Sequence, residues 1–203
     1  MTKKRVGLLV MAYGTPYKAS DIKPYYTHIR NGREPSEEAL LDLTEKYEAI
    51  GGVSPMAKIT KAQVNALADT LNSMQAEIEF IPYIGLKHIE PFIEDAVAEI
   101  AEAGIKEIAS IVLAPHYSSL SIKGYNKRAN EEAGKYGITV NSVESWYDEA
   151  GYIEYWAKAI QDEYDKMTDI EKEKSVTIFS AHSLPKNILK IDDPYVDQLE
   201  ETA

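Results

Sequence analysis

The chain has 203 residues, of which 44% are apolar, and it carries a formal net charge of −11 and no cysteine. Its length and apolar fraction suffice for a substantial buried core. The negative charge argues against a nucleic-acid-binding protein, because phosphate backbones attract basic surfaces. The lack of cysteine excludes disulfides, thiolate catalysis, iron-sulfur clusters and Cys-based zinc sites within this sequence.

No apolar run is long enough to cross a bilayer, and the first five residues lead directly into strand-like sequence without a small-residue cleavage site. We therefore expect a cytoplasmic protein without membrane insertion. An anionic ligand is compatible with the net charge if basic side chains gather locally.

The first predicted strand is the apolar run VGLLVMA over residues 6–12, which is typical of a strand covered on both faces. It ends at Tyr13-Gly14-Thr15-Pro16. Cap and stop signals then predict three helices. The first is capped by Ser20 or Asp21 and ends at Asn31-Gly32. The second runs from about Ser36 to Gly51-Gly52, and the third from Ser54-Pro55 to about Met74. This helical insertion, about residues 15–75, is too long for a simple crossover and is expected to form one wall of a cleft.

Strands and helices then alternate regularly. The predicted elements are a strand at 77–84, a helix with its apolar face at 89–100, a strand at 108–114, a helix at 122–135, a strand at 138–143 and a helix with its apolar face at 153–167. Strands separated by helices predict an α/β fold with a doubly wound, Rossmann-like parallel sheet.

Residues 176–179, VTIF, predict one more strand, which places His182 at the carboxyl end of a strand. Ligands of open α/β sheets bind at that edge. His88 and His116 also follow predicted strands, whereas His28 lies in a helix, so three of the four histidines are expected at one rim. The alternative is a histidine that only caps the strand through local hydrogen bonds.

Common catalytic and binding motifs are missing from the sequence. It contains no HExxH motif, no carboxylate cluster with metal-ligand spacing, no glycine-rich phosphate loop and no GxSxG elbow. A tight structural metal site and nucleotide binding are therefore both disfavoured.

Basic and aromatic residues are concentrated in and around the insertion. The first basic group contains Arg30, Arg33, Lys18, Lys23 and Lys46, the second contains Lys123, Lys127 and Arg128, and the tyrosines that could line a pocket are Tyr13, Tyr25, Tyr26, Tyr47 and Tyr125. Solvated charges and half-buried core tyrosines are the alternative interpretation. A cleft that combined arginine, tyrosine and serine would suit a planar polycarboxylate.

The last predicted helix starts at Asp193-Pro194 and has only about two to three turns before the sequence stops. We expect the chain to be a fragment of a longer protein, with a short helix that packs as a stub as the alternative. The predicted organisation is an N-terminal domain over 1–175, followed by the start of a second half over 176–203.

Five stretches of the chain resemble the ferrochelatase family. They are GLLVMAYGTP at 7–16, YYTHIR at 25–30, YEAIGGVSP at 47–55, IVLAPHYS at 111–118 and SAHSLP at 180–185. The resemblance extends over the whole chain. It is greatest to the water-soluble Gram-positive type, which inserts iron into coproporphyrin III.

This resemblance implies a class II chelatase fold and a set of site residues. It assigns His182 as the metal-binding catalytic histidine and Tyr13 as the residue axial to the iron of the product. Contacts to the porphyrin or its propionates are implied for Arg30, Lys46, Tyr47, Ser54 and Tyr125. Lys46 stands where close family members have arginine, which keeps the charge but loses the bidentate fork.

The same resemblance implies Fe(II) and a porphyrin as substrates, no cofactor and a monomeric full-length protein. Ferrochelatases also have a glutamate in their second half that faces the histidine, and this sequence stops before it. We therefore expect the 203-residue chain to bind porphyrin weakly and to metallate it negligibly. Two alternatives are a cobalt or nickel chelatase and a tetrapyrrole-binding module without turnover.

Overall fold

A computed structural model describes residues 3–203 of the chain. These residues form two compact units. The first contains the chain up to residue 113 together with 125–143, and the second contains 114–124 and 144–203. The predicted domain boundary between residues 175 and 176 lies inside the second unit and stays a prediction.

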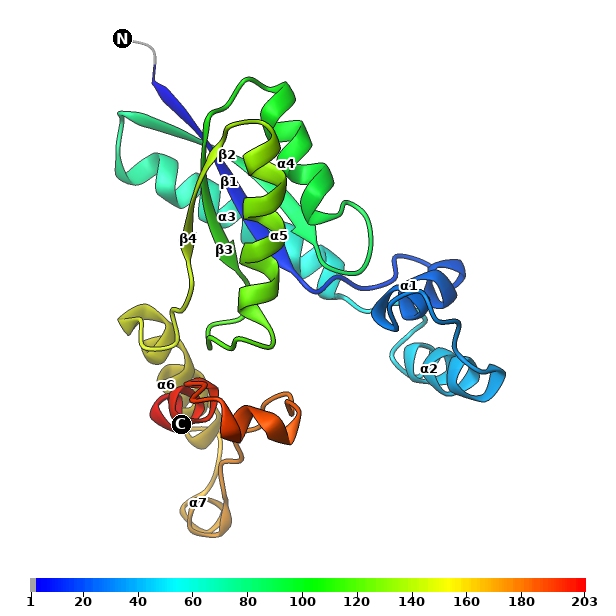
Figure 1. Ribbon diagram of the computed structural model, residues 1–203. Coiled ribbons are helices and arrows are strands. Elements are labelled where there is room, and N and C mark those ends of the chain that lie inside the picture. The colour runs from blue at the N-terminus through cyan, green and yellow to red at the C-terminus, as the bar shows by residue number, and fades with distance from the viewer. Residues whose placement is uncertain (1–2) are drawn as a thin grey trace. The chain divides into compact units, whose positions relative to one another are not determined.

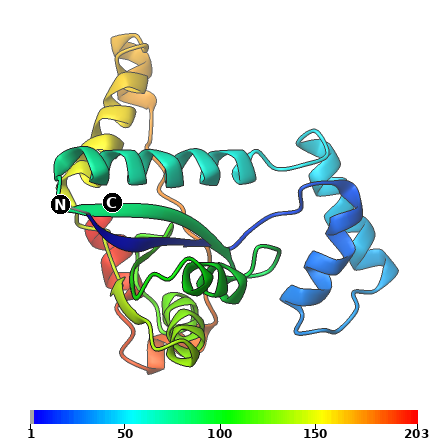
Figure 2. The same ribbon diagram turned by 90° about the horizontal axis from the view of Figure 1, so that it is seen from above.

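The first unit is built on a parallel sheet (Figure 1). Its strands are β1 (Lys4–Ala12), β2 (Ile78–Leu86), β3 (Glu107–Val112) and β4 (Thr139–Val143), in the order β2-β1-β3-β4. Helix α3 (Met56–Met74) covers one face, and α4 (Ile93–Glu102) and α5 (Ile122–Lys135) cover the other (Figure 2). The predicted α/β fold with a Rossmann-like parallel sheet is confirmed.

Strand β1 lies in the middle of the sheet and is buried on both faces. Leu8 and Val10 pack against Val64 of α3. Leu9 and Met11, which alternate with them and therefore point to the opposite face, are 0% exposed. This burial on both sides explains why β1 is an almost uninterrupted apolar run.

The insertion after β1 contains the three predicted helices, α1 (Ile22–Ile29), α2 (Glu37–Ala49) and α3, and a short 3-10 turn, η1 (Ala19–Asp21). The boundary signals act as predicted at two places. Ser36 accepts a hydrogen bond from the Ala39 amide at 3.3 Å, and α1 is followed by Asn31 and Gly32 with φ of 54° and 84°.

The second unit contains α6 (Ala150–Tyr164), α7 (Asp169–Lys174), the 3-10 turn η2 (Lys186–Lys190) and α8 (Tyr195–Thr202). Helix α7 was not predicted, although Thr168 and Glu171 form a capping box at its start. Within residues 3–203, no helix combines the length and the apolar character that a membrane crossing needs.

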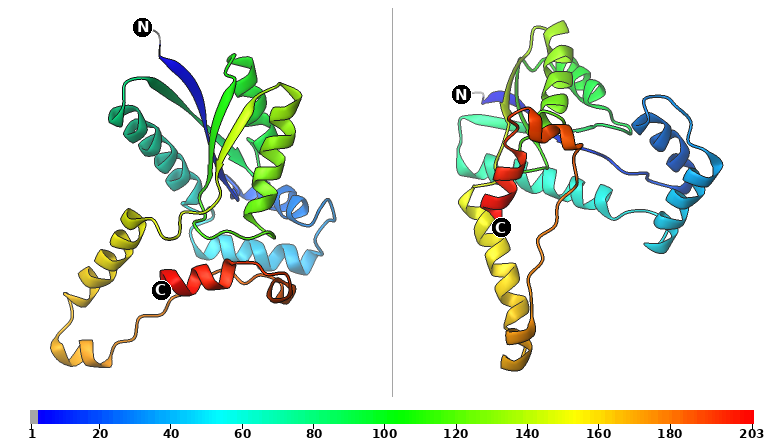
Figure 3. Two further views of the ribbon diagram at one scale, coloured as in Figure 1. Left: turned by 60° about the vertical axis from the view of Figure 1, so that its left-hand side comes forward. Right: turned by 60° about the horizontal axis from the view of Figure 1, so that its bottom comes forward.

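The strand predicted at residues 176–179 is wrong. Figure 3 shows the chain after α7 as an extended trace without a strand arrow. A strand requires a hydrogen-bonded neighbour, and none of the described strands pairs with this segment. Its apolar side chains are correspondingly exposed, Val176 by 81% and Ile178 by 84%. His182 therefore does not follow a strand in this structure.

Candidate functional site

The candidate site of the first unit begins where β1 and β2 end. The two strands pair up to Ala12 and Leu86, and two further hydrogen bonds continue the ladder, from the Lys87 amide to the Ala12 carbonyl at 2.9 Å and from the His88 amide to the Tyr13 carbonyl at 3.2 Å. The rings of Tyr13 and His88 consequently lie 4.4 Å apart between centroids. The strand register, continued by one residue, would set Tyr13 opposite Lys87, so the contact between Tyr13 and His88 accompanies the loop hydrogen bond from the His88 amide rather than the register.

The loop after β1 is held by tyrosines from the insertion. The Tyr25 hydroxyl donates to the Gly14 carbonyl at 3.0 Å, and the Tyr47 hydroxyl lies 3.2 Å from the Thr15 hydroxyl. Tyr13 meets the Tyr25 ring edge-on, with 6.4 Å between centroids. Burial and, secondly, the nearby Tyr47 raise the pKa of the Tyr13 phenol, so Tyr13 is protonated at neutral pH.

A cation lies over the aromatic ring of Tyr125. The Lys87 ammonium nitrogen is 4.7 Å from the centroid of this buried ring, a cation–π geometry. Burial and then the Arg128 charge lower the pKa of Lys87. Arg128 itself donates to both carboxylate oxygens of Glu94, at 2.7 and 2.5 Å, and to the Lys87 carbonyl at 2.8 Å. The end of β2 is thereby fixed to α4 and α5.

Two histidines also meet beside Tyr13, a pairing that the sequence did not predict. The Nδ1 atoms of His28 and His88 are 3.0 Å apart, and His28 stacks on Phe92 with 5.1 Å between centroids. Both histidines line a pocket of about 630 Å³. His28 was placed in a helix and set apart from the rim, but helix α1 starts only nine residues after Tyr13, so a contact with the end of β1 was possible.

The His88 imidazole is expected to titrate far below neutral pH. Burial, followed by the charges of Lys87, His28 and Arg128, lowers its pKa from 6.5 to about 4. Between pH 6.5 and pH 4, His88 is protonated in the unfolded chain but mostly neutral in the folded chain. The contribution of the neutral imidazole to folding stability is therefore complete above pH 6.5 and is lost as the pH falls toward 4.

Nuclear magnetic resonance of the His88 ring protons measures this titration. A His88→Phe variant should lose less stability between pH 6.5 and 4 than the original chain, because its ring at this position does not ionise. A His88 midpoint near 6.5 would contradict the described burial.

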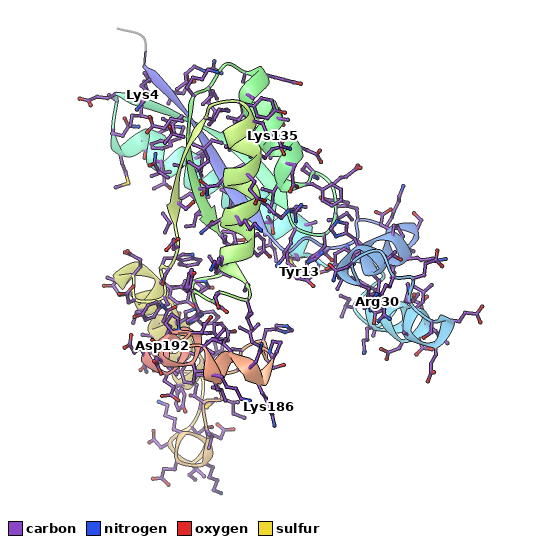
Figure 4. All side chains as sticks on the ribbon, in the orientation of Figure 1. Lys4, Tyr13, Arg30, Lys135, Lys186 and Asp192 are labelled. Atoms are coloured by element: carbon purple, nitrogen blue, oxygen red, sulfur yellow. The ribbon has the colours of Figure 1, made fainter. Side chains whose placement is uncertain are left out.

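The remaining residues implied by the resemblance are distributed around the insertion. Arg30 comes directly after α1 (Figure 4). Its Cζ atom lies over the Tyr26 ring, 5.6 Å from the centroid. Lys46 is exposed and pairs with Asp42 at 2.6 Å. The Ser54 hydroxyl accepts a hydrogen bond from the Met56 amide at 3.2 Å at the start of α3. Of the seven implied residues, only His182 lies outside the first unit.

His182 belongs to the second unit and is exposed. Its carbonyl accepts a hydrogen bond from the Tyr195 hydroxyl at 3.0 Å. His116 lies in the same unit, where its Nε2 is 2.9 Å from the Thr202 hydroxyl and burial lowers its pKa. Since His88 belongs to the first unit, the common rim expected for the three histidines stays a prediction.

The loop that carries His116 is tied to the last helix of the second unit. The Asp193 carboxylate accepts hydrogen bonds from the Ser119 amide at 2.7 Å and from the Ser119 hydroxyl at 2.6 Å, and the Tyr117 amide donates to the Gln198 side chain at 2.6 Å. A pocket of about 580 Å³ in this unit is lined by His116, Trp156, Phe179, Ala181 and Leu199, among others. The segment just before His182 thus contributes to a largely apolar pocket.

The described residues of the two units do not bring together enough protein ligands for a closed metal site. In the described part of the chain, no three or more histidine, aspartate or glutamate side chains are grouped so that they could hold a metal ion. Any ion bound by these residues would keep water or substrate among its ligands.

Comparison with known proteins identifies the family. The family model described as ferrochelatase matches residues 5–203. The whole chain aligns at 64% identity with "Coproporphyrin III ferrochelatase" of Oceanobacillus iheyensis, covering 65% of that protein, and at 58% identity with the protein of the same name from Bacillus subtilis, covering 66%. The chain thus spans about two thirds of the length of these relatives. On the family match and these identities, the chain belongs to the ferrochelatase family.

Proposed function

We propose that the protein acts in heme biosynthesis as a lyase that inserts Fe(II) into coproporphyrin III. The observation that carries this proposal is the 64% identity, over the whole chain, to a protein named coproporphyrin III ferrochelatase. The aromatic side chains beside Tyr13 support it, because a flat macrocycle with carboxylate substituents needs apolar ring contacts and nearby cations.

Metallation sets the chemical requirements. Two pyrrole N–H bonds break, two protons leave, and four porphyrin nitrogens replace water on Fe(II), which is a substrate and not a resident cofactor. The reaction therefore needs a base and a metal ligand that releases the ion. Imidazole is a borderline ligand for Fe(II) and accepts protons near neutral pH, and we assign both roles to His182.

Tyr13 is proposed to lie on the axial side of the metallated ring. Its side chain is 42% exposed beside Tyr25 and His88, and its raised pKa keeps the phenol protonated. A neutral phenol is a weak metal ligand, so it can approach the product iron without holding it. Tyr47 and Tyr125 of the same unit, together with Ser54, are proposed to contact the macrocycle.

Arg30 and Lys46 are proposed to bind propionates. Both are exposed, and the pair of Lys46 with Asp42 is a surface ion pair, which is easily exchanged for another carboxylate. The guanidinium of Arg30 can form two parallel hydrogen bonds to one carboxylate, whereas the Lys46 ammonium acts as a point charge.

Replacing Arg30 by alanine is expected to weaken porphyrin binding by about 1.5–3 kcal/mol if the propionate contact is well desolvated, as for hydrogen bonds to charged groups. Lys127→Ala is the matched control, since this exposed lysine is paired with Glu131 in its own helix. A fluorescence titration with coproporphyrin measures both affinities. Equal affinities for the two variants would remove Arg30 from the propionate site.

The proposed substrates are tested by competition. The complete gene product is offered Fe(II), Co(II) and Ni(II) with coproporphyrin and protoporphyrin, and insertion is followed by absorbance. A preference for coproporphyrin, with four propionates, supports the proposal, whereas a preference for protoporphyrin, with two, would contradict it. Faster insertion of cobalt or nickel into another tetrapyrrole would favour the related class II chelatases.

For the 203-residue chain itself we propose porphyrin binding with little or no turnover. The segment before His182 is exposed and unpaired with any described strand, so the histidine lacks the rigid support that catalysis requires. Robust iron insertion by this chain, measured beside the complete gene product, would refute this second proposal.

We further propose a cytoplasmic location, a monomeric full-length protein and no nucleic-acid partner. The net charge of −11 supports the last point, because phosphate backbones repel an acidic surface. Size-exclusion chromatography of the complete gene product tests the monomer, and a dimer peak at micromolar concentration would exclude it.

A further inference from the structure

The His28 and His88 side chains form a pair that the proposed chelatase reaction does not use. They come from different elements, His28 from α1 and His88 from the loop after β2, and their Nδ1 atoms are 3.0 Å apart. His28 is fixed by stacking on Phe92, and His88 by its ring contact with Tyr13 and by its backbone hydrogen bond to the Tyr13 carbonyl. Two imidazole nitrogens are thus held facing each other on ordered segments.

The distance between the two Nδ1 atoms is close to the spacing of two nitrogen ligands that bind the same metal ion. Imidazole–zinc bonds are about 2.0–2.1 Å long, so nitrogens separated by 3.0 Å subtend an angle of roughly 91–97° at an ion bonded to both of them. This is close to the angle between neighbouring ligands in square-planar or octahedral sites, and a small opening of the pair reaches the tetrahedral angle.

The protonation chemistry also permits coordination. In the hydrogen-bonded pair, one Nδ1 donates its proton to the lone pair of the other. An ion needs a lone pair from each Nδ1, and the donor imidazole provides it by changing tautomer, so that its proton moves from Nδ1 to Nε2 through solvent. No net proton is released by the two neutral rings.

The surrounding charges favour a weak, exchangeable site over a tight one. Lys87 and Arg128 contribute positive charge near His88, although the Arg128 charge is paired with Glu94. Asp21 and Glu90 line the same pocket and offer negative charge. With two protein ligands, the other coordination positions remain open to water.

We propose that His28 and His88 bind a divalent transition-metal ion of borderline softness, through Nδ1 of each ring, at an accessory site beside Tyr13. This ion class includes zinc, nickel, copper and ferrous iron, all of which accept imidazole nitrogen. His182 belongs to the other unit and is not one of the two proposed ligands. It requires neither porphyrin nor turnover.

The test is a titration with Zn²⁺ alone, on the 203-residue chain carrying His182→Ala, so that the proposed iron ligand cannot contribute. Calorimetry measures affinity, and ¹⁵N resonances of the histidine rings report which nitrogens coordinate. We expect the Nδ1 resonances of His28 and His88 to shift together and the His116 resonances to stay unchanged.

His28→Phe is the decisive variant, because it keeps an aromatic ring to stack on Phe92 and removes the ring nitrogen. It should weaken Zn²⁺ binding at least about tenfold, since loss of a supporting residue around a metal already costs 10–100-fold. His116→Ala is the control and should bind as before. Unchanged affinity in His28→Phe, or a titration that shifts neither Nδ1, overturns the proposal without affecting the proposed function, which is measured by iron insertion.

Discussion

His182→Ala is expected to lower iron insertion into coproporphyrin by about 10²–10⁴-fold, the usual contribution of a positioned general base. The loss should appear in kcat, because the proposed role of His182 is to take a pyrrole proton and to hold Fe(II) during transfer, and these interactions form along the reaction path. Porphyrin affinity should change little, since the proposed macrocycle contacts belong to the first unit.

The matched control for this variant is His116→Ala, which removes a histidine of the same unit that is hydrogen-bonded to Thr202. Both variants are assayed in the complete gene product, with folding checked by circular dichroism. Iron insertion by His182→Ala at close to the original rate, or an equal loss in both variants, would show that His182 is not the catalytic histidine.

The sheet of the first unit was predictable from the sequence because its strands and helices carry strong local signals. The run VGLLVMA became β1, and the helix expected at 122–135 is α5 with the same bounds. Strand ends moved by only one or two residues, as for β2, which continues to Leu86 beyond the expected end at residue 84. In each case burial, hydrophobic period and turn residues agree.

The segment before His182 shows where this reasoning fails. Residues 176–179 have high β-propensity, but propensity describes how a side chain fits a pleated surface and provides no partner strand. Among the described strands β4 pairs only with β3, and the segment stays unpaired. The position of His182 therefore depends on a non-local contact that the local pattern could not reveal.

The candidate site was predictable in part. Tyr13 was assigned by resemblance and its role stays a prediction, whereas its place at the end of β1 follows from the strand pattern. The pairing of His28 with His88 was missed because it depends on how α1 packs against the loop after β2, and neither residue carries a spacing motif. The Tyr125 contact with Lys87 was missed for the same reason.

Gly14→Ala is expected to destabilise the first unit by about 2–4 kcal/mol, which combines the cost of left-handed backbone for a residue with Cβ and the cost of overpacking. Gly14 has a φ of +87°, and a Cβ built there would lie 2.7 Å from the Cγ2 atom of Ile89. Ile89 is branched at Cβ and turns only with difficulty. The loop must therefore shift, which would weaken the Tyr25 hydrogen bond to the Gly14 carbonyl.

Gly104→Ala separates the two causes, because Gly104 has a φ of +73° but no neighbouring atom within 4 Å of an added Cβ. This control should cost only about 1–2 kcal/mol of unfolding free energy, which is the cost of the left-handed backbone alone.

Urea unfolding measures both variants, and the His88 titration of Gly14→Ala supplies a second measurement. Because the shifted loop would loosen the ring contact between Tyr13 and His88, the His88 midpoint should rise from about 4 toward 6.5. If Gly14→Ala costs no more than Gly104→Ala and leaves the His88 midpoint unchanged, Ile89 does not confine the loop, and the position of Tyr13 is set by the tyrosines of the insertion alone.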